Sequence, residues 1–135
     1  MDYKVVTDQF AVAPQISPEN IEQIKSLGYK VVINNRPDEE TPGQPGTDDI
    51  RSLCENAGLE YYHLPIMSGT LPVEAIDQTR ELLNKIEGPV FAYCRSGTRS
   101  ITLWALSQMG QQPSDKVISA VENAGYDLPF LHNYR

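Results

Sequence analysis

The sequence predicts a single α/β domain with a central, mainly parallel sheet of four or five strands and helices on both faces. Short apolar runs alternate with helical patterns along the whole chain, and such alternation is typical of a parallel sheet covered by helices. The length of 135 residues corresponds to about one domain. We therefore expect residues 1–135 to form one unit.

Four segments are predicted as strands because each is a short, largely apolar run between turn signals. They are residues 10–13, 29–34, 59–64 and 89–93. The second and fourth of these are apolar on both faces, which indicates buried positions in a parallel sheet. The polar residues before the first run are not assigned to an element.

Five helices are predicted from the spacing of their apolar residues. Hydroxyl residues before three of the apolar stripes predict the N-terminal caps, which are Ser17, Thr47 and Ser114. The other two helices are predicted over residues 73–86 and 100–109. The latter is apolar on nearly all sides, so we expect it in the interior.

Residues 36–46 are predicted to form a mobile loop without regular structure. This segment contains three prolines, two glycines and three acidic residues, a composition that favours neither helix nor strand.

The charge balance excludes several classes of partner. Eleven Lys and Arg against eighteen Asp and Glu give a net charge of −7, which argues against nucleic acid or an anionic membrane. No run of 18 apolar residues is present, and the first residues lack the pattern of a secretory signal, so we expect a cytoplasmic protein. The sequence leaves the oligomeric state open.

The seven residues from Cys94 to Ser100 join a buried strand to a buried helix. At this edge of a parallel sheet, ligands commonly bind. The backbone N–H groups of the loop can form an anion cradle, in which Gly97 allows the tight turn, and the helix N-terminus adds partial positive charge. We expect the cradle to bind a small anionic substrate through Ser96, Gly97 and Thr98. Arg95 points outward in this prediction, where it either steers the substrate at the rim or forms a plain surface salt bridge.

Cys94 is the predicted nucleophile of this loop. The positive surroundings favour its thiolate form at neutral pH. Arg99 can hold a tetrahedral anion with two parallel hydrogen bonds, and Ser100 is predicted to donate a hydrogen bond to the thiolate. The competing interpretation is a buried core cysteine beside a simple turn, but two buried arginines would then lack an anion.

Two further residues are weighed against structural roles. His63 ends a predicted strand at the same sheet edge and is a candidate substrate-binding residue, the alternative being a histidine packed against the next helix. Cys54 lies on the apolar stripe of its helix, which favours a core position, the alternative being a resolving thiol for Cys94. The two cysteines and two histidines lack metal-ligand spacing, and the predicted chemistry requires no cofactor.

The loop resembles the active loop of cysteine-dependent phosphatases, whose pattern is C-x(5)-R-[ST]. The segment YKVVINNRPDEE, preceded by ISPENIEQIKSLG, is similar to the corresponding part of dual-specificity phosphatases. Together with CRSGTRSITLWAL, these segments resemble the bacterial phosphatase-like domain found in beta-lactamase-hydrolase-like proteins. The resemblance implies a cysteine-phosphatase fold and hydrolysis of a phosphate ester through a phosphocysteine. It also implies that Arg36 lies near the loop, where it binds substrate or braces the loop, unless it pairs with a neighbouring acid at the surface.

The sequence departs from the phosphatase pattern at three places. Four residues rather than five separate Cys94 from Arg99, as in the six-residue loop of rhodanese sulfurtransferases. The segment 66–71 contains no carboxylate to protonate a leaving group, and Tyr93 stands where phosphatases usually have histidine. Two alternatives therefore accompany the phosphatase: a rhodanese-like sulfurtransferase acting through a Cys94 persulfide, and a non-catalytic module that binds phosphorylated or other anionic ligands.

Overall fold

The computed structural model describes residues 1–134, and over this range it contains one five-stranded sheet in the order β1-β2-β5-β3-β4. The outer strand β1 pairs antiparallel with β2, while the other three pairs are parallel. The predicted fold class is thus confirmed. The strands are β1 (Lys4–Thr7), β2 (Phe10–Ala13), β3 (Val31–Asn34), β4 (Glu60–His63) and β5 (Val90–Tyr93).

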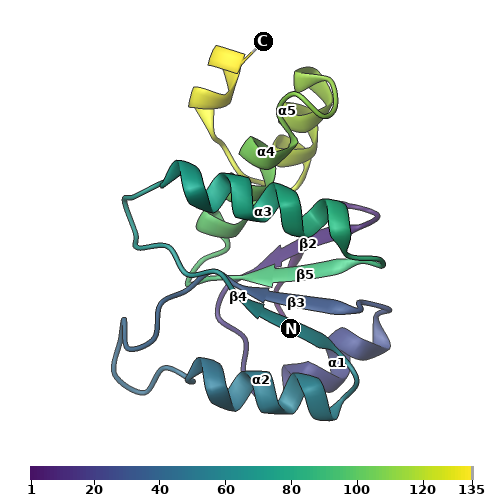
Figure 1. The fold of residues 1–135 in the computed structure, drawn as a ribbon, viewed down its shortest axis with the longest axis vertical. Coiled ribbons are helices and arrows are strands. Elements are labelled where there is room, and N and C mark those ends of the chain that lie inside the picture. Colours follow the sequence, from purple (N-terminus) through teal and green to yellow (C-terminus); the bar gives the residue numbers. More distant parts are fainter. Residues whose placement is uncertain (135) are drawn as a thin grey trace.

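Helices cover both faces of the sheet (Figure 1). On one face lie α1 (Asn20–Ser26) and α2 (Thr47–Asn56). On the other lie α3 (Val73–Lys85), α4 (Thr98–Gln108), α5 (Ser114–Asn123) and the 3₁₀ helix η1 (Pro129–Tyr134). Successive strand residues point to opposite faces, so Phe91 packs in the core under α1 and α2 while Ala92 packs in the core under α4.

The centre of the sheet supports the loop that begins at Cys94. All four residues of β5 are buried, and they pair with β2 on one side and with β3 on the other. The following helix α4 is buried along most of its length, including Ile101, Trp104 and Ala105, as its apolar pattern predicts. The loop therefore connects two elements that are fixed on all sides.

Several predicted details of the elements are wrong. β1 was not predicted because two of its four residues are exposed, which gives no apolar run, and η1 was not predicted either. The predicted caps are also misplaced, since the N-cap positions are occupied by Glu19, Gly46 and Pro113. Instead of capping, the Thr47 hydroxyl lies 2.6 Å from the Tyr61 hydroxyl.

The segment 36–46 contains no helix or strand, as predicted, but hydrogen bonds tie it together. The Gln44 side chain donates to the Pro37 carbonyl at 2.9 Å and accepts from the Glu40 N–H at 3.0 Å. The Asp38 carboxylate accepts from the Thr47 N–H at 2.9 Å. These bonds tie the loop to itself and to the start of α2, while its mobility stays a prediction.

Candidate active site

The candidate site lies where the carboxyl ends of the parallel strands meet, on the side where Figure 1 shows the loops after β3 and β4. Three backbone hydrogen bonds join the strand ends there. The Asn35 N–H donates to the Tyr93 carbonyl at 2.8 Å, the Cys94 N–H to the Ala13 carbonyl and the Gln15 N–H to the Arg95 carbonyl, both at 3.4 Å. Segments from β2, β3 and β5 are thus fixed against one another around Cys94.

The Cys94 thiol is buried and bound inside its own loop. Its side chain has no exposed surface, and its Sγ accepts a hydrogen bond from the Gly97 N–H at 3.1 Å. Gly97 is the N-cap of α4 and has φ +92°. The sulfur therefore lies within hydrogen-bond distance of a backbone donor at the N-terminus of α4.

Gly97 is required at its position for two reasons. A positive φ is costly for residues with a Cβ, and a Cβ here would collide with the hydroxyl of Tyr126. That hydroxyl donates to the Ser96 carbonyl at 3.1 Å, so Tyr126 braces the loop from the segment between α5 and η1. Burial raises the pKa of Tyr126, and the nearby Cys94 adds a smaller effect in the same direction. The hydroxyl therefore stays protonated and able to donate.

Arg99 is held by an acid that the sequence did not single out as a site residue. Its two terminal nitrogens each lie 2.8 Å from an oxygen of the Glu40 carboxylate. One of them also donates to the Ile66 carbonyl at 2.8 Å. This two-pronged pair fixes the plane of the guanidinium. The hydrogen bond to Glu40 is the main cause that raises the pKa of Arg99, and the nearby Cys94 adds a smaller effect in the same direction.

Arg36 donates to the same carboxylate, at an oxygen that Arg99 also contacts. Its Nε donates to Glu40 at 2.8 Å, and its other nitrogens donate to Gln15 at 3.0 Å and Thr41 at 3.3 Å. Arg36 does pair with a neighbouring acid, as the alternative predicted. Because Arg36 is only 3% exposed, however, this is not a surface ion pair. The guanidinium is occupied by these contacts, a placement that suits a brace for Arg99.

The backbone directs Glu40 into this position. Its neighbour Glu39 has φ +63°, and it is the one non-glycine residue with positive φ in the described chain. Such a conformation is uncommon outside glycine and often marks functional segments. It turns the loop so that Glu40 reaches two arginines, one of them 59 positions away in sequence.

The Glu40 cluster predicts a pH dependence of stability. The hydrogen bond from Arg99, supported by Arg36, lowers the Glu40 pKa from 4.5 to about 2. The stabilisation is therefore complete above pH 4.5 and is lost as the pH falls through about 2. We expect about 1–2 kcal/mol from this group, because its side chain is 20% exposed and solvent weakens the interaction.

Urea unfolding at pH 7, 4 and 2.5 measures this dependence. The loss of stability between pH 7 and pH 2.5 should be smaller in Glu40→Gln by most of that amount, because the contribution is complete at pH 7 and largely lost at pH 2.5. The control Glu81→Gln removes an exposed carboxylate of α3 and should leave the loss unchanged. A Glu40→Gln variant with the pH dependence of the parent would contradict the assignment.

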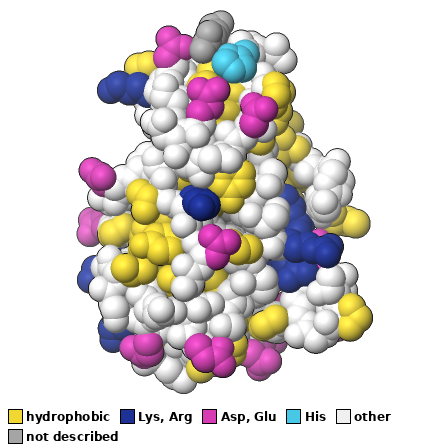
Figure 2. Space-filling view, turned by 180° about the vertical axis from the view of Figure 1, so that it is seen from behind, with side chains coloured by type: hydrophobic (Ala, Val, Ile, Leu, Met, Phe, Trp, Pro, Cys, Tyr) yellow, Lys and Arg dark blue, Asp and Glu magenta, His cyan; other side chains and the backbone are white. Residues whose placement is uncertain are grey.

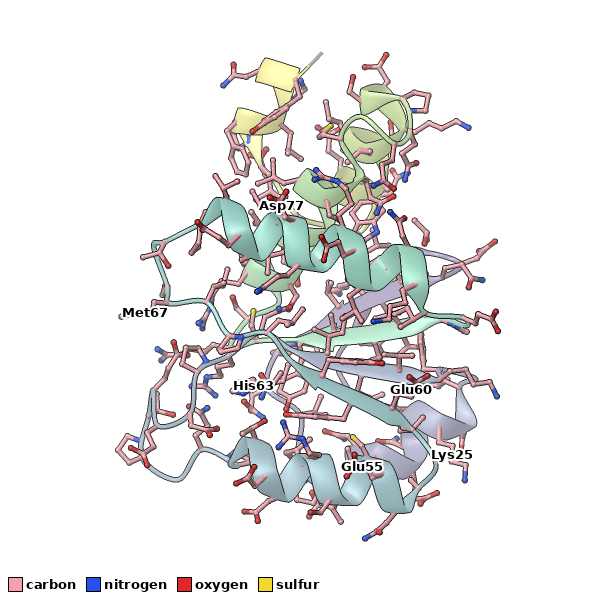
Figure 3. The ribbon with its side chains drawn as sticks, viewed as in Figure 1. Lys25, Glu55, Glu60, His63, Met67 and Asp77 are labelled. Atoms are coloured by element: carbon pink, nitrogen blue, oxygen red, sulfur yellow. The ribbon has the colours of Figure 1, made fainter. Side chains whose placement is uncertain are left out.

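His63 lies at the end of β4, and Ser100 lies in the first turn of α4. The His63 ring is 2.9 Å from the Arg36 carbonyl, so one ring nitrogen is engaged at the end of β4 (Figure 3). The Ser100 hydroxyl is buried and has no hydrogen-bond partner among residues 1–134. The predicted hydrogen bond from Ser100 to Cys94 is therefore absent in this structure.

The second cysteine is a core residue. Cys54 is fully buried between the sheet and α2, and burial raises the pKa of its thiol to about 12. Both cysteines are free. This placement agrees with the structural interpretation, and no disulfide joins Cys54 to Cys94.

The Tyr93 side chain belongs to a buried polar network beneath the loop. Its hydroxyl lies 3.4 Å from that of Tyr61, to which the Asn34 amide donates at 3.0 Å. Burial raises the pKa of Tyr93. Tyr93 therefore remains neutral and anchors the strand end from which Cys94 emerges.

A cavity of about 300 Å³ opens beside the loop. In the space-filling view, Lys and Arg side chains gather on the side where the strand ends lie (Figure 2). The cavity combines hydroxyl, apolar and cationic side chains, and none of its lining residues is acidic. They are Ile66, Ser68, Gly69, Thr70, Leu71, Arg95, Ser96, Thr98, Arg99, Thr102 and Phe130.

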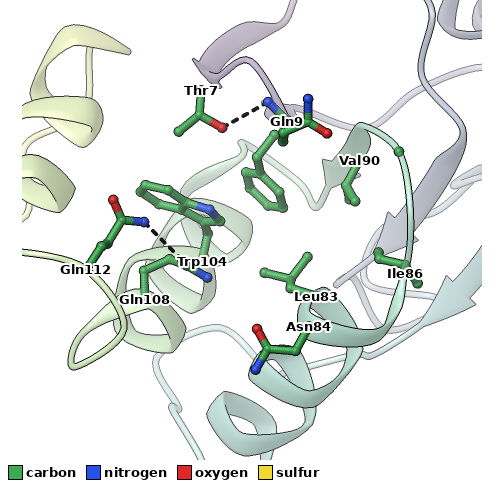
Figure 4. A pocket seen from close by; sticks show the side chains of 11 residues that line it. Thr7, Gln9, Leu83, Asn84, Ile86, Val90, Trp104, Gln108 and Gln112 are labelled. Carbon is green, nitrogen blue, oxygen red and sulfur yellow. Dashed lines mark hydrogen bonds between the residues drawn. The ribbon is translucent and has the colours of Figure 1, made fainter.

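A second cavity, of about 450 Å³, lies on the β1–β2 side of α4, near Trp104 (Figure 4). Its lining contains carboxamides such as Asn84 and Gln108 but no charged or nucleophilic side chain. Unlike the cavity beside the loop, this one therefore offers neither an arginine nor a thiol.

Within residues 1–134, no three His, Cys, Asp or Glu side chains are grouped as metal ligands would be. Over the same residues, no helix has the length and apolar character needed to cross a membrane.

Comparison with known proteins places these features in one family. Residues 2–111 match the family described as beta-lactamase hydrolase-like protein, phosphatase-like domain. A beta-lactamase hydrolase-like protein of Agrobacterium fabrum is 34% identical over 125 residues, which are 91% of this chain and 29% of that protein. The chain thus spans less than a third of this curated relative.

Solved structures share the fold of this chain. A candidate phosphatase from Neisseria meningitidis Z2491 superposes with a TM-score of 0.84 at 33% identity, over 98% of this chain and 97% of that one. TpbA from P. aeruginosa, solved in complex with pTyr, is 18% identical and superposes with a TM-score of 0.62 over 89% of this chain and 69% of that one. The second likeness concerns the fold alone.

Proposed function

Because the chain belongs to the phosphatase-like domain family of beta-lactamase hydrolase-like proteins, we propose that it hydrolyses a small phosphate ester with Cys94 as nucleophile. The observation that carries the proposal is the bond from the Gly97 N–H to the Cys94 sulfur at 3.1 Å, at the N-terminus of a buried helix and beside the fixed Arg99. The loop N–H groups and Arg99 would hold the phosphoryl oxygens.

The first chemical step forms a phosphocysteine. The Cys94 thiolate attacks phosphorus, so that an S–P bond forms while the ester P–O bond breaks and its electron pair leaves with the alcohol oxygen. Arg99 supports this step because its plane is already set by Glu40. A fixed donor needs little reorganisation when charge develops on the phosphoryl oxygens.

The second step returns the enzyme to its starting state. Water attacks phosphorus, the S–P bond breaks, its electron pair returns to the Cys94 sulfur, and the protons of the water leave with the inorganic phosphate. The Ser100 hydroxyl is buried without a hydrogen-bond partner among residues 1–134. A buried polar group in this condition costs free energy, and it gains a hydrogen bond if a charged sulfur forms beside it during the reaction. We assign to Ser100 a hydrogen bond to the departing thiolate in this step.

The leaving group must depart without a strong proton donor. The loop of residues 66–71 holds no carboxylate, and Glu40, with its pKa lowered to about 2, stays ionised at neutral pH. Loss of general acid catalysis reduces rates by about 10²–10⁴-fold when the leaving group is a poor one.

We therefore expect a strong dependence on the leaving group. Hydrolysis of 4-nitrophenyl phosphate should be about 10²–10⁴-fold faster in kcat/KM than that of glycerol 1-phosphate. The measurement is phosphate release at pH 7 from a series of aryl and alkyl phosphates. Equal rates across the series would show that an acid serves the site and would contradict this mechanism.

The length of the loop supports a second candidate function, a rhodanese-like sulfurtransferase. Four residues separate Cys94 from Arg99, which makes the cradle smaller than that of phosphatases. Here the Cys94 thiolate would attack the outer sulfur of thiosulfate, an S–S bond would form, and sulfite would leave with the electron pair of the broken S–S bond. This reaction needs no general acid.

A further inference from the structure

Arg95, directly after the nucleophile, is a cation without a partner. Its guanidinium has no hydrogen bond or ion pair to any of residues 1–134, whereas each of the other described arginines lies within 3.1 Å of a carboxylate oxygen. Its backbone is nevertheless fixed, since the Arg95 carbonyl accepts a hydrogen bond from the Gln15 N–H.

The positions of the two loop arginines give them different roles. Both line the cavity of about 300 Å³. The two terminal nitrogens of Arg99 are bound by Glu40, which offsets its charge. No acidic residue lines the cavity, so the charge of Arg95 is not offset and remains available to a ligand.

We propose that Arg95 forms a subsite for a second anionic group of the substrate. The proposal rests on the proposed function and makes the substrate a small phosphate monoester whose alcohol part carries a carboxylate or a second phosphate. The phosphoryl group binds at Cys94 and Arg99. The second anion pairs with Arg95, while Ile66, Leu71 and Phe130 contact the carbon skeleton between them. A cavity of this volume is at the small end of ligand sites, which favours a small metabolite over a larger molecule.

Two aryl phosphates that differ in one charge test the subsite. The kcat/KM for 3-carboxyphenyl phosphate should exceed that for phenyl phosphate by about tenfold at low salt, because a guanidinium–carboxylate hydrogen bond is charge-assisted. In Arg95→Gln this ratio should fall to near one. The control Lys25→Gln removes the same charge at the opposite end of the molecule (Figure 3) and should keep the ratio of the parent.

A binding measurement separates failure of the subsite from failure of the proposed function. Titration calorimetry with methylphosphonate and 2-carboxyethylphosphonate needs no turnover. If neither ester is cleaved, the phosphatase proposal fails, but tighter binding of 2-carboxyethylphosphonate that disappears in Arg95→Gln still supports the subsite. Equal binding of the two phosphonates by the parent, or a preference that persists in Arg95→Gln, would overturn it.

Discussion

Cys94→Ser is expected to lower kcat/KM for 4-nitrophenyl phosphate by about 10⁴-fold or more. A serine hydroxyl is a far weaker acid than a thiol, and among residues 1–134 no carboxylate or imidazole is hydrogen-bonded to Cys94 as a base would be. Removal of a nucleophile typically has an effect of this size. The fold should persist, because serine is close in volume to cysteine and can accept the Gly97 N–H.

Initial rates and circular dichroism measured on the same preparations check this result. The matched control is Cys54→Ala, which removes the other thiol of the chain from the core under α1 and α2. It should lower stability by about 1–2 kcal/mol while kcat/KM stays within about threefold. A Cys94→Ser variant with a tenth or more of the parent activity would exclude Cys94 as the nucleophile.

Arg99→Lys is expected to lower kcat/KM by about 10²–10³-fold. Lysine keeps the positive charge, but an ammonium group cannot present two parallel donors to one anion. The substitution also removes the two-pronged pair with Glu40 and therefore the fixed orientation of the cation. Loss of one preorganised donor to a developing oxyanion has an effect of this order.

Arg99→Lys should weaken the binding of phosphate less than it slows the reaction. The Kd for inorganic phosphate, measured by calorimetry, should rise by less than kcat/KM falls, because Arg99 acts most strongly in the transition state. The control is Arg80→Lys, the same replacement at an arginine of α3 that contacts Asp77 and the end of α4. Equal kinetics for Arg99→Lys and Arg80→Lys would contradict the assigned role.

The apolar pattern of the chain was sufficient to predict the sheet and most helices. Burial on both faces leaves continuous apolar runs in β3 and β5, and these runs are visible in sequence. The edge strand β1 is half exposed and leaves no such run. Hydroxyl residues predicted the wrong caps because Ser17 bonds to Asn20 before the helix begins, whereas Thr47 faces the core.

The loop of residues 94–99 could be identified from sequence because its residues are contiguous. Its supports could not. Glu40 is one of three adjacent acidic residues, and its contact with Arg99 depends on the positive φ of Glu39 and on the hydrogen bonds within the loop. Tyr126 reaches the loop from a position 30 residues away. Such contacts depend on the packing of separate elements, and no local pattern records them.

The most direct test of the proposed function is the intact mass of the reduced protein after brief reaction with 4-nitrophenyl phosphate and rapid acid quenching. A parallel sample is treated with thiosulfate. The phosphatase mechanism predicts an added phosphoryl group that peptide mapping places on Cys94 and that is absent in Cys94→Ser. Addition of one sulfur atom from thiosulfate, with neither phosphorylation nor nitrophenol release, would contradict it and establish the sulfurtransferase. No adduct and no product in either sample would contradict both enzymes and leave the anion-binding module.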